Sequence, residues 1–227
     1  MKGRRIALTV LFGVVFGVLG VQAFAQNSAN EVLFDAASNG TVADVQAALK
    51  ADANVNARDE DGTTALMYAA KNNESPDVVK ALIDAGVNVN AKNEYDYTAL
   101  IYNVQYNANY DVVKALIDAD ADVNAKTVGG FTVLMYAAMN NADASVIKAL
   151  LVAGANVNAR EQIVGQTALM YAARNNEHPD VIKELINAGA DVNAKDRRGQ
   201  KASGHLKDNE KLRATDTYWE IRDLLSR

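Results

Sequence analysis

The spacing of one recurring phrase constrains this chain more than any other feature. Val-Asn-Ala followed by Lys or Arg occurs five times, with its asparagine at Asn56, Asn90, Asn124, Asn158 and Asn193. The intervals between these asparagines are 34, 34, 34 and 35 residues. A second phrase, Thr-Ala-Leu-Met-Tyr-Ala-Ala, begins at Thr64 and Thr167, with looser copies at Thr98 and Thr132. A fixed period of this size indicates a stacked array of small units that share one core.

Each period contains two short segments whose apolar residues recur at helical spacing. The first segment follows one of the four threonines, a residue type that caps a helix by accepting a hydrogen bond from its first turn. The second segment ends at Gly86, Asp120, Gly154 or Gly189, where a left-handed residue terminates a helix. We expect the aligned asparagines to bond the backbone of neighbouring turns and so tie one unit to the next.

This register divides the chain into six units. An N-terminal capping repeat covers 31–58, four full units cover 59–92, 93–126, 127–160 and 161–195, and a degraded C-terminal capping segment covers 196–227. The terminal units carry polar outer faces, as the ends of a stack require. In the last segment Gly204-His205 interrupts the first helix, and a final helix is expected to begin near Asp216 or Thr217.

Residues 1–25 differ in kind from the repeats. A basic head with Lys2, Arg4 and Arg5 precedes an apolar run, and Ala23-Phe24-Ala25 supplies small residues two positions apart. This is the layout of a signal peptide with cleavage near Ala25. Retention as a membrane anchor is the alternative, although the run is shorter than the roughly 20 apolar residues that span a bilayer. We therefore expect a protein that is exported to the periplasm or secreted, with residues 26–30 as a disordered polar leader.

Charge and composition exclude several classes of function. The formal net charge is −5, and loss of residues 1–25 removes three positive charges and no negative one. The resulting charge of −8 disfavours nucleic acid as a partner, and no membrane contact is expected beyond the signal peptide. There is no cysteine, and His178 and His205 have no partners at a recognisable spacing. Phosphate-binding loops and nucleophile motifs are missing from the sequence, so no catalytic residue, metal site or cofactor is expected.

The repeated residues carry a resemblance to a known family. The first full unit has Gly62-Thr63-Thr64-Ala65-Leu66 with Ala69-Ala70, then Val78-Val79-Lys80-Ala81-Leu82 with Ala85-Gly86, then Val89-Asn90-Ala91, and the same positions can be aligned in each later unit. This pattern resembles the ankyrin repeat. The resemblance implies an all-α fold, an ankyrin-repeat solenoid of helix–turn–helix units with short β-hairpin loops. The departures are Ala or Val in place of the usual proline, Met or Ile in place of the usual histidine, and a loop that is one residue longer.

The unit 93–126 departs most from the pattern. It holds five of the nine tyrosines, Asn103-Val104 in place of the alanine pair, and Asp120 in place of the closing glycine. The resemblance implies a concave recognition face made of hairpin tips and the exposed side of each first helix. Carried onto this chain, its partner-binding residues are Tyr95, Tyr97, Tyr106, Phe131, Met139, Lys71, Gln105, Asn140 and Arg174. On this face the five aromatic and methionine side chains among them would be neighbours across the units 93–126 and 127–160. Interface energy concentrates in such aromatic anchors, which favours a binding surface here. The alternative is that repeat drift placed tyrosines on a half-buried face.

These observations favour a non-enzymatic protein–protein interaction module that binds a protein partner as a monomer. In the exported setting it would be a scaffold, an inhibitor or a protective partner of another exported protein. A secreted factor that engages a host protein is the second hypothesis. A small hydrolase with an unrecognised site and a purely structural spacer remain as alternatives from other classes.

Overall fold

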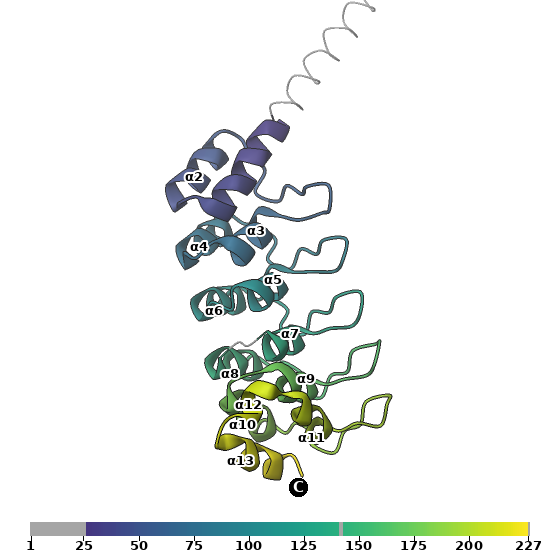
Figure 1. Ribbon diagram of the computed structural model, residues 1–227. Helices are drawn as coiled ribbons and strands as arrows, with labels where there is room; N and C mark the ends of the chain where they lie inside the picture. Colours follow the sequence, from purple (N-terminus) through teal and green to yellow (C-terminus); the bar gives the residue numbers. More distant parts are fainter. Residues whose placement is uncertain (1–25, 141–142, 227) are drawn as a thin grey trace, which may run out of the picture.

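The structure is a computed structural model that describes residues 26–140 and 143–226. Helix pairs stack along one axis, and a hairpin-shaped loop projects from each junction toward the same side (Figure 1). Within those ranges, extended pairing is limited to two isolated antiparallel bridges, Arg58 with Thr64 and Lys126 with Thr132. The expected all-α repeat solenoid with short hairpin loops is confirmed. The expected signal peptide, 1–25, lies outside the described residues.

Each full unit contributes one first helix and one second helix. The pairs are α3 (Ala65–Asn72) with α4 (Pro76–Asp84), α5 (Ala99–Tyr106) with α6 (Tyr110–Asp118), α7 (Val133–Met139) with α8 (Ala144–Val152), and α9 (Ala168–Asn175) with α10 (Pro179–Asn187). The N-terminal unit pairs helical residues 26–39 with α2 (Val42–Lys50). The C-terminal segment holds α11 (Ala202–His205), the 3-10 turn η1 (Leu206–Asp208), α12 (Glu210–Arg213) and α13 (Thr217–Leu224).

Threonine caps start three of the four first helices as expected. The hydroxyls of Thr64, Thr98 and Thr132 accept hydrogen bonds from the backbone N–H three residues later, at 3.4, 3.3 and 3.3 Å. The expectation is wrong for Thr167, whose side chain makes no cap bond. There the N–H of Met170 bonds the main-chain oxygen of Thr167 at 3.1 Å, which takes the donor that the hydroxyl would use.

The segment 26–30 is helical rather than a disordered leader. It continues into the helix that ends at residue 39, whose Leu33 and Ala37 are fully buried. The side-chain oxygen of Asn30 accepts a hydrogen bond from the N–H of Asn54 at 2.8 Å. A polar stretch therefore becomes ordered because it docks on the turn that leads into the next unit.

The core is a ribbon that runs the length of the stack. First helices supply Leu66, Leu100, Leu134 and Leu169, and second helices supply Leu82, Leu116, Leu150 and Leu185, all buried. Since each unit covers the apolar face of the next, stability is spread along the array. In the part of the chain that the structure describes, no helix is long and apolar enough to cross a bilayer.

The column of aligned asparagines ties successive units together. The side-chain amide of Asn124 donates to the carbonyl of Gly154 at 3.0 Å, and its oxygen accepts from the N–H of Asn156 at 2.8 Å. Asn90 makes the same two bonds to Asp120 and Asp122, at 2.9 and 2.7 Å. Equivalent pairs start from Asn56 and Asn158. The predicted structural role of this column is confirmed.

Candidate functional site

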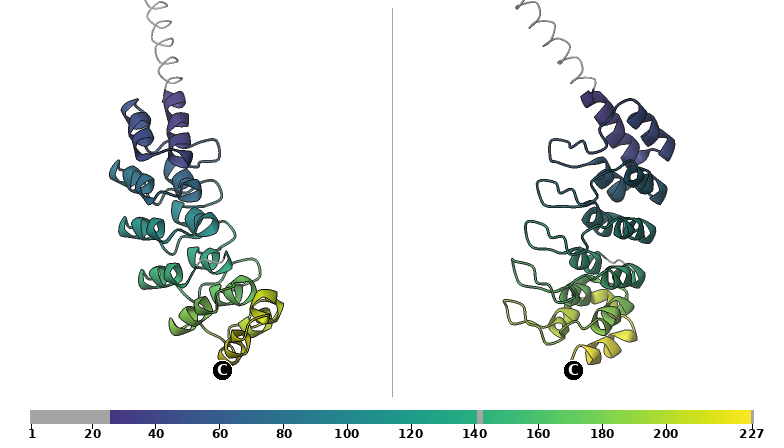
Figure 2. Two further views of the ribbon diagram at one scale, coloured as in Figure 1. Left: turned by 60° about the vertical axis from the view of Figure 1, so that its left-hand side comes forward. Right: turned by 180° about the vertical axis from the view of Figure 1, so that it is seen from behind.

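The hairpins form one continuous edge of the molecule. Figure 2 shows them in a row from two further directions. Single backbone hydrogen bonds join neighbouring hairpins: Glu94 N–H to Asp61 at 3.0 Å, Val128 N–H to Tyr95 at 3.3 Å, Gln162 N–H to Gly129 at 3.0 Å, and Arg197 N–H to Val164 at 2.8 Å. We call this edge the tip row and define it by Glu60, Asp61, Glu94, Tyr95, Val128, Gly129, Gln162, Ile163, Arg197 and Arg198.

A polar side chain at the base of the hairpin fixes its shape. The amide oxygen of Asn93 accepts hydrogen bonds from the N–H groups of Tyr95 and Tyr97, at 3.0 and 2.9 Å. Glu161 does the same in its own hairpin for the N–H groups of Val164 and Gln166, at 3.0 and 2.8 Å. Burial would raise the pKa of Glu161, but the hydrogen bonds from backbone N–H groups outweigh it and lower that pKa. The hairpins are thus presented as ordered loops.

Behind the tip row, six aromatic rings form a chain across three units. The ring centroids are 6.0 Å apart for Tyr106–Tyr102, 5.2 Å for Tyr102–Tyr97, 5.7 Å for Tyr97–Tyr136, 5.6 Å for Tyr136–Phe131 and 5.7 Å for Phe131–Tyr171. We call these six residues the aromatic ribbon. Rings at these separations attract one another beyond the area they bury. The ribbon is therefore a packed surface and not a set of independent side chains.

A cation lies over one end of the aromatic ribbon. The ammonium of Lys71 lies 5.0 Å from the ring centre of Tyr106 and 5.8 Å from that of Tyr102. At the other end, the positive charge of Arg174 acts on Tyr171 and opposes the rise of its pKa. Cations over ring faces gain from the ring quadrupole. Lys71 consequently helps to hold Tyr106 in place while that ring stays 56% exposed.

The hydroxyls of Tyr97, Tyr102 and Tyr171 are neutral at physiological pH. Burial raises the pKa of Tyr97 to about 12, and its hydroxyl lies 2.8 Å from that of Tyr136. Burial also raises the pKa of Tyr171 to about 12 and that of Tyr102 above its usual value. These groups can therefore donate or accept hydrogen bonds without bringing charge to a partner.

The structure brings together only part of the predicted partner-binding set. Tyr97, Tyr106 and Phe131 belong to the aromatic ribbon, and Lys71 covers one end of it. Tyr95 makes no ring-to-ring contact with another described residue and lies on the tip row, 58% exposed. Its backbone bonds to Asn93 and Val128 direct it there, so the expectation that it neighbours the other rings is wrong.

The remaining predicted residues lie on the first helices. Met139 is partly buried and packs against the core, as Tyr97 and Phe131 also do. Asn140 and Arg174 are exposed. Gln105 is half-buried, and its side-chain oxygen is buried without a hydrogen-bond partner among the described residues. Asn103, two residues earlier, has a side-chain oxygen in the same condition. Both atoms come from α5, in the irregular unit.

Sequence reasoning missed three members of the ribbon. Tyr102, Tyr136 and Tyr171 occupy a tyrosine position that recurs in each full unit, and such recurrence indicates packing. Tyr136 and Tyr171 are indeed 7% and 9% exposed, which confirms the packing role. Tyr136 also bridges Tyr97 and Phe131, which come from hairpins, and Tyr171 contacts Phe131. The available signal was an aromatic residue five positions before the recurring tyrosine, at Tyr97 and Phe131 alone among the four full units.

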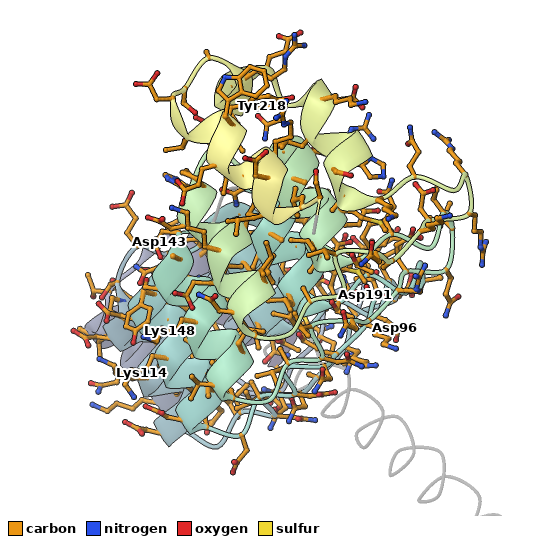
Figure 3. All side chains as sticks on the ribbon, turned by 90° about the horizontal axis from the view of Figure 1, so that it is seen from below. Asp96, Lys114, Asp143, Lys148, Asp191 and Tyr218 are labelled. Atoms are coloured by element: carbon orange, nitrogen blue, oxygen red, sulfur yellow. The ribbon has the colours of Figure 1, made fainter. Side chains whose placement is uncertain are left out.

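The other surface features of the described residues lie away from the aromatic ribbon. A groove of about 400 Å³ lies between the helix ending at residue 39 and α2, at the open end of the stack and away from the ribbon. Figure 3 places Lys114 and Lys148 on the second-helix side, opposite Asp96 on the hairpin side. No group of three or more histidine, cysteine, aspartate or glutamate side chains in 26–140 and 143–226 is arranged to hold a metal ion.

Comparisons with known proteins agree with this architecture. A family model for ankyrin repeats in three copies matches residues 33–127 and 126–196. A search of curated proteins found no match. Solved structures match in 526 chains, so the fold is common and does not by itself identify a partner.

One of these structures is a complex of a predatory endopeptidase from Bdellovibrio bacteriovorus with an immunity protein. The similar chain there is the immunity protein, which is bound to the endopeptidase. It is 34% identical in sequence, with a TM-score of 0.71. The match covers 86% of this chain and 96% of that one.

Proposed function

Because the chain belongs to the ankyrin repeat family, we propose that it captures another protein on the face formed by its hairpins and first helices, and that it catalyses no reaction. Ankyrin repeats are protein-interaction modules, which supports the general class. The face itself is proposed from the side chains that it carries.

The aromatic ribbon is the observation that carries this proposal. Binding energy concentrates in aromatic anchors that are well packed and surrounded by polar groups. Tyr106 is 56% exposed yet fixed by Lys71 and Tyr102, so little side-chain entropy is lost when a partner covers it. The hydroxyl pair of Tyr97 and Tyr136 and the amide of Gln105 add hydrogen-bonding groups beside the rings. A spacer protein would have no use for such a surface.

The proposed partner is a peptidase. The immunity protein that resembles this chain is bound to an endopeptidase, and the likeness extends over nearly its whole length. We extend this role to the chain as a protective partner that keeps a peptidase of the same cell from acting on that cell. The basic and apolar layout of residues 1–25 supports export, so we place the encounter in the periplasm or outside the cell, after cleavage near Ala25.

A binding experiment tests the proposal directly. The purified protein is titrated against the Bdellovibrio predatory endopeptidase. It is also used to capture proteins from the envelope fraction of the organism that produces it. Peptidase activity is measured with and without the protein. We expect a captured peptidase whose activity falls on binding. Tyr106→Ser should weaken this complex by roughly 30-fold, because an exposed and well-held aromatic anchor contributes about 2 kcal/mol or more.

Tyr110→Ser is the matched control. Tyr110 is also an exposed tyrosine, at 41%, but it begins α6 on the second-helix side. Its replacement should leave binding unchanged. Equal loss from both variants, or no loss from either, would reject the ribbon as the binding face. A captured protein without peptidase activity would reject the proposed partner class and leave the ribbon standing.

A further inference from the structure

We propose that the tip row binds one extended segment of the partner protein, and that this segment has three parts of different chemistry. Basic side chains of the partner lie against the tips near Asp61, apolar side chains lie against the central tips, and carboxylates lie against Arg197 and Arg198. This inference rests on the proposed function, since it concerns the same partner. It adds the partner's chemistry and its direction along the array.

The two ends of the tip row carry opposite charge. Glu60, Asp61 and Glu94 are exposed at the N-terminal end, and Arg197 and Arg198 are exposed at the C-terminal end. Arg58 lies at the base of the first hairpin and Arg160 at the base of the fourth, and each donates to a main-chain carbonyl of the next unit. The three exposed carboxylates outnumber Arg58 at the N-terminal end, so the two ends still differ in the sign of their charge. The nearby carboxylate of Glu161 is buried and accepts hydrogen bonds from backbone N–H groups, and it forms no ion pair with Arg197 or Arg198.

The centre of the tip row is apolar. Tyr95, Val128 and Ile163 are 58%, 65% and 63% exposed and lie on three consecutive hairpins. Only eight large apolar side chains of the described residues are strongly exposed, and these three are the ones that adjoin along a hydrogen-bonded edge. Exposed apolar groups gathered in this way mark a contact surface.

The extra residue of the fourth full unit supports the same reading. That interval is 35 residues long instead of 34, and the additional position falls at Ile163-Val164. Glu161 anchors the enlarged hairpin by accepting from the N–H groups of Ile163, Val164 and Gln166. The added residue is therefore ordered, and it enlarges the hairpin that presents Ile163 in the apolar centre.

The dimensions suit one extended segment of a partner protein. Packed helices lie about 10 Å apart, so four intervals between the five tips span roughly 40 Å. An extended chain advances about 3.3 Å per residue, so about 12 residues cover the row. Charge complementarity at both ends then fixes the direction of that segment and excludes partners of uniform charge.

Three designed 12-residue peptides test this inference without the natural partner. They share an apolar centre with one tyrosine and carry lysines at one end and glutamates at the other, lysines at both ends, or glutamates at both ends. Nuclear magnetic resonance of the ¹⁵N-labelled protein measures their affinities. We expect the mixed peptide to bind roughly fivefold more tightly than either uniform one, from exposed ion pairs of modest strength. Equal affinities would overturn the proposal.

The direction of binding is measured separately. A nitroxide on the lysine end of the mixed peptide should broaden the amide signals of Asp61 and Glu94 and spare those of Arg197 and Arg198. Arg197→Glu with Arg198→Glu should shift the preference to the peptide with lysines at both ends. Lys148→Glu with Val152→Ser is the matched control, because it alters a charge and an 81% exposed apolar group on α8. Broadening at both ends of the row overturns the proposal.

Other occupants of the tip row would be visible in the same set of experiments. Self-association that depends on Tyr95 and Ile163, measured by sedimentation, would assign the row to a second copy of this chain. Binding of phosphatidylglycerol vesicles through Arg197 and Arg198 would assign it to a lipid surface. Either result overturns this inference. If the tip variants keep the captured peptidase while Tyr106→Ser loses it, this inference fails and the proposed function stands.

Discussion

Residues 93–126 and 127–160 fold into units of equal length and the same helix order, yet they place different residues at the same backbone positions. At two left-handed turns the second of these units has Gly130 and Gly154, with φ of 79° and 92°. The first has Asp96 and Asp120, with φ of 61° and 59°. Side chains other than glycine are strained in that region. The irregular unit keeps the family backbone without the residues that suit it best.

Further departures lie within the same unit. Ala108 adopts a φ of 49°, so three of the four left-handed non-glycine residues of the described chain are in 93–126. Asn103 is fully buried with an unpartnered oxygen where the other units have alanine. Strained and unsatisfied groups persist only where the surroundings hold them, and they cluster at functional sites. The comparison teaches that the unit with the surplus tyrosines depends on its regular neighbours for its shape.

The largest effect is expected from the shared core. Leu134→Ala in the regular unit should lower the free energy of unfolding by about 2–5 kcal/mol, because it leaves a cavity in a tightly packed ribbon. Leu100→Ala makes the same change in the irregular unit, and both leucines are 1% exposed. Chemical denaturation compares the two. A smaller loss at Leu100 would show that the irregular unit relaxes around the cavity, and a negligible loss at both would reject the register.

The asparagine column should come next. Asn124→Ala removes two hydrogen bonds between units and should lower the free energy of unfolding by about 2 kcal/mol, at roughly 1 kcal/mol per bond. Asn90→Ala removes the equivalent bonds to Asp120 and Asp122 of the irregular unit. Thermal and urea unfolding measure both. A much larger loss of unfolding free energy for Asn90→Ala would show that the hydrogen bonds of Asn90 hold the strained turn at Asp120.

An exchange of residues at the left-handed turn isolates the backbone term. Gly154→Asp should lower the free energy of unfolding by about 1 kcal/mol. A Cβ atom at this position meets no atom within 4 Å, so the loss is expected to come chiefly from the backbone conformation. Asp120→Gly should raise it by up to about 1 kcal/mol. Unfolding of the two variants and of the double exchange measures the term, and stabilisation by Gly154→Asp contradicts this account.

The smallest effect appears only in alkali. Tyr68 and Tyr97 both have a pKa raised to about 12, Tyr68 chiefly by its hydrogen bond to Asp59 and Tyr97 chiefly by burial. A raised pKa in the folded protein stabilises below the unfolded value near 10, and this contribution is lost as pH rises toward 12. Asp59→Asn should return the pKa of Tyr68 toward 10 and leave that of Tyr97 unchanged. Absorbance of tyrosinate against pH measures both, and a parallel shift of the two rings would contradict the assigned causes.

The period of the sequence was sufficient to predict the fold. A 34-residue repeat with apolar residues at helical spacing fixes which faces must be buried, and Leu66, Leu100, Leu134 and Leu169 lie where that register requires. The helical state of residues 26–30 was not predictable in this way, because it depends on a bond between Asn30 and Asn54 that joins distant parts of the sequence.

The candidate site was predicted only in part. The surplus of tyrosines located the irregular unit, but spacing along the chain does not reveal how side chains meet across units. Tyr97 and Tyr136 are 39 residues apart and meet through their hydroxyls. Tyr95 and Tyr97 alternate along the hairpin, so one faces the tip row and the other the ribbon.

The hydrogen bonds of the asparagine column have a consequence for how the number of units in such a protein can change. Each asparagine donates to and accepts from the backbone of the following unit, so equivalent backbone positions are bonded at every junction. Only at the end does the pattern change, where Asn193 accepts from the ammonium of Lys201 at 2.7 Å. If 127–160 were excised, Asn124 would face Gly189 as it now faces Gly154. Duplication or loss of whole units therefore leaves no unmatched junction, and a lineage can fit its array to partners of different size by copying one segment of the gene.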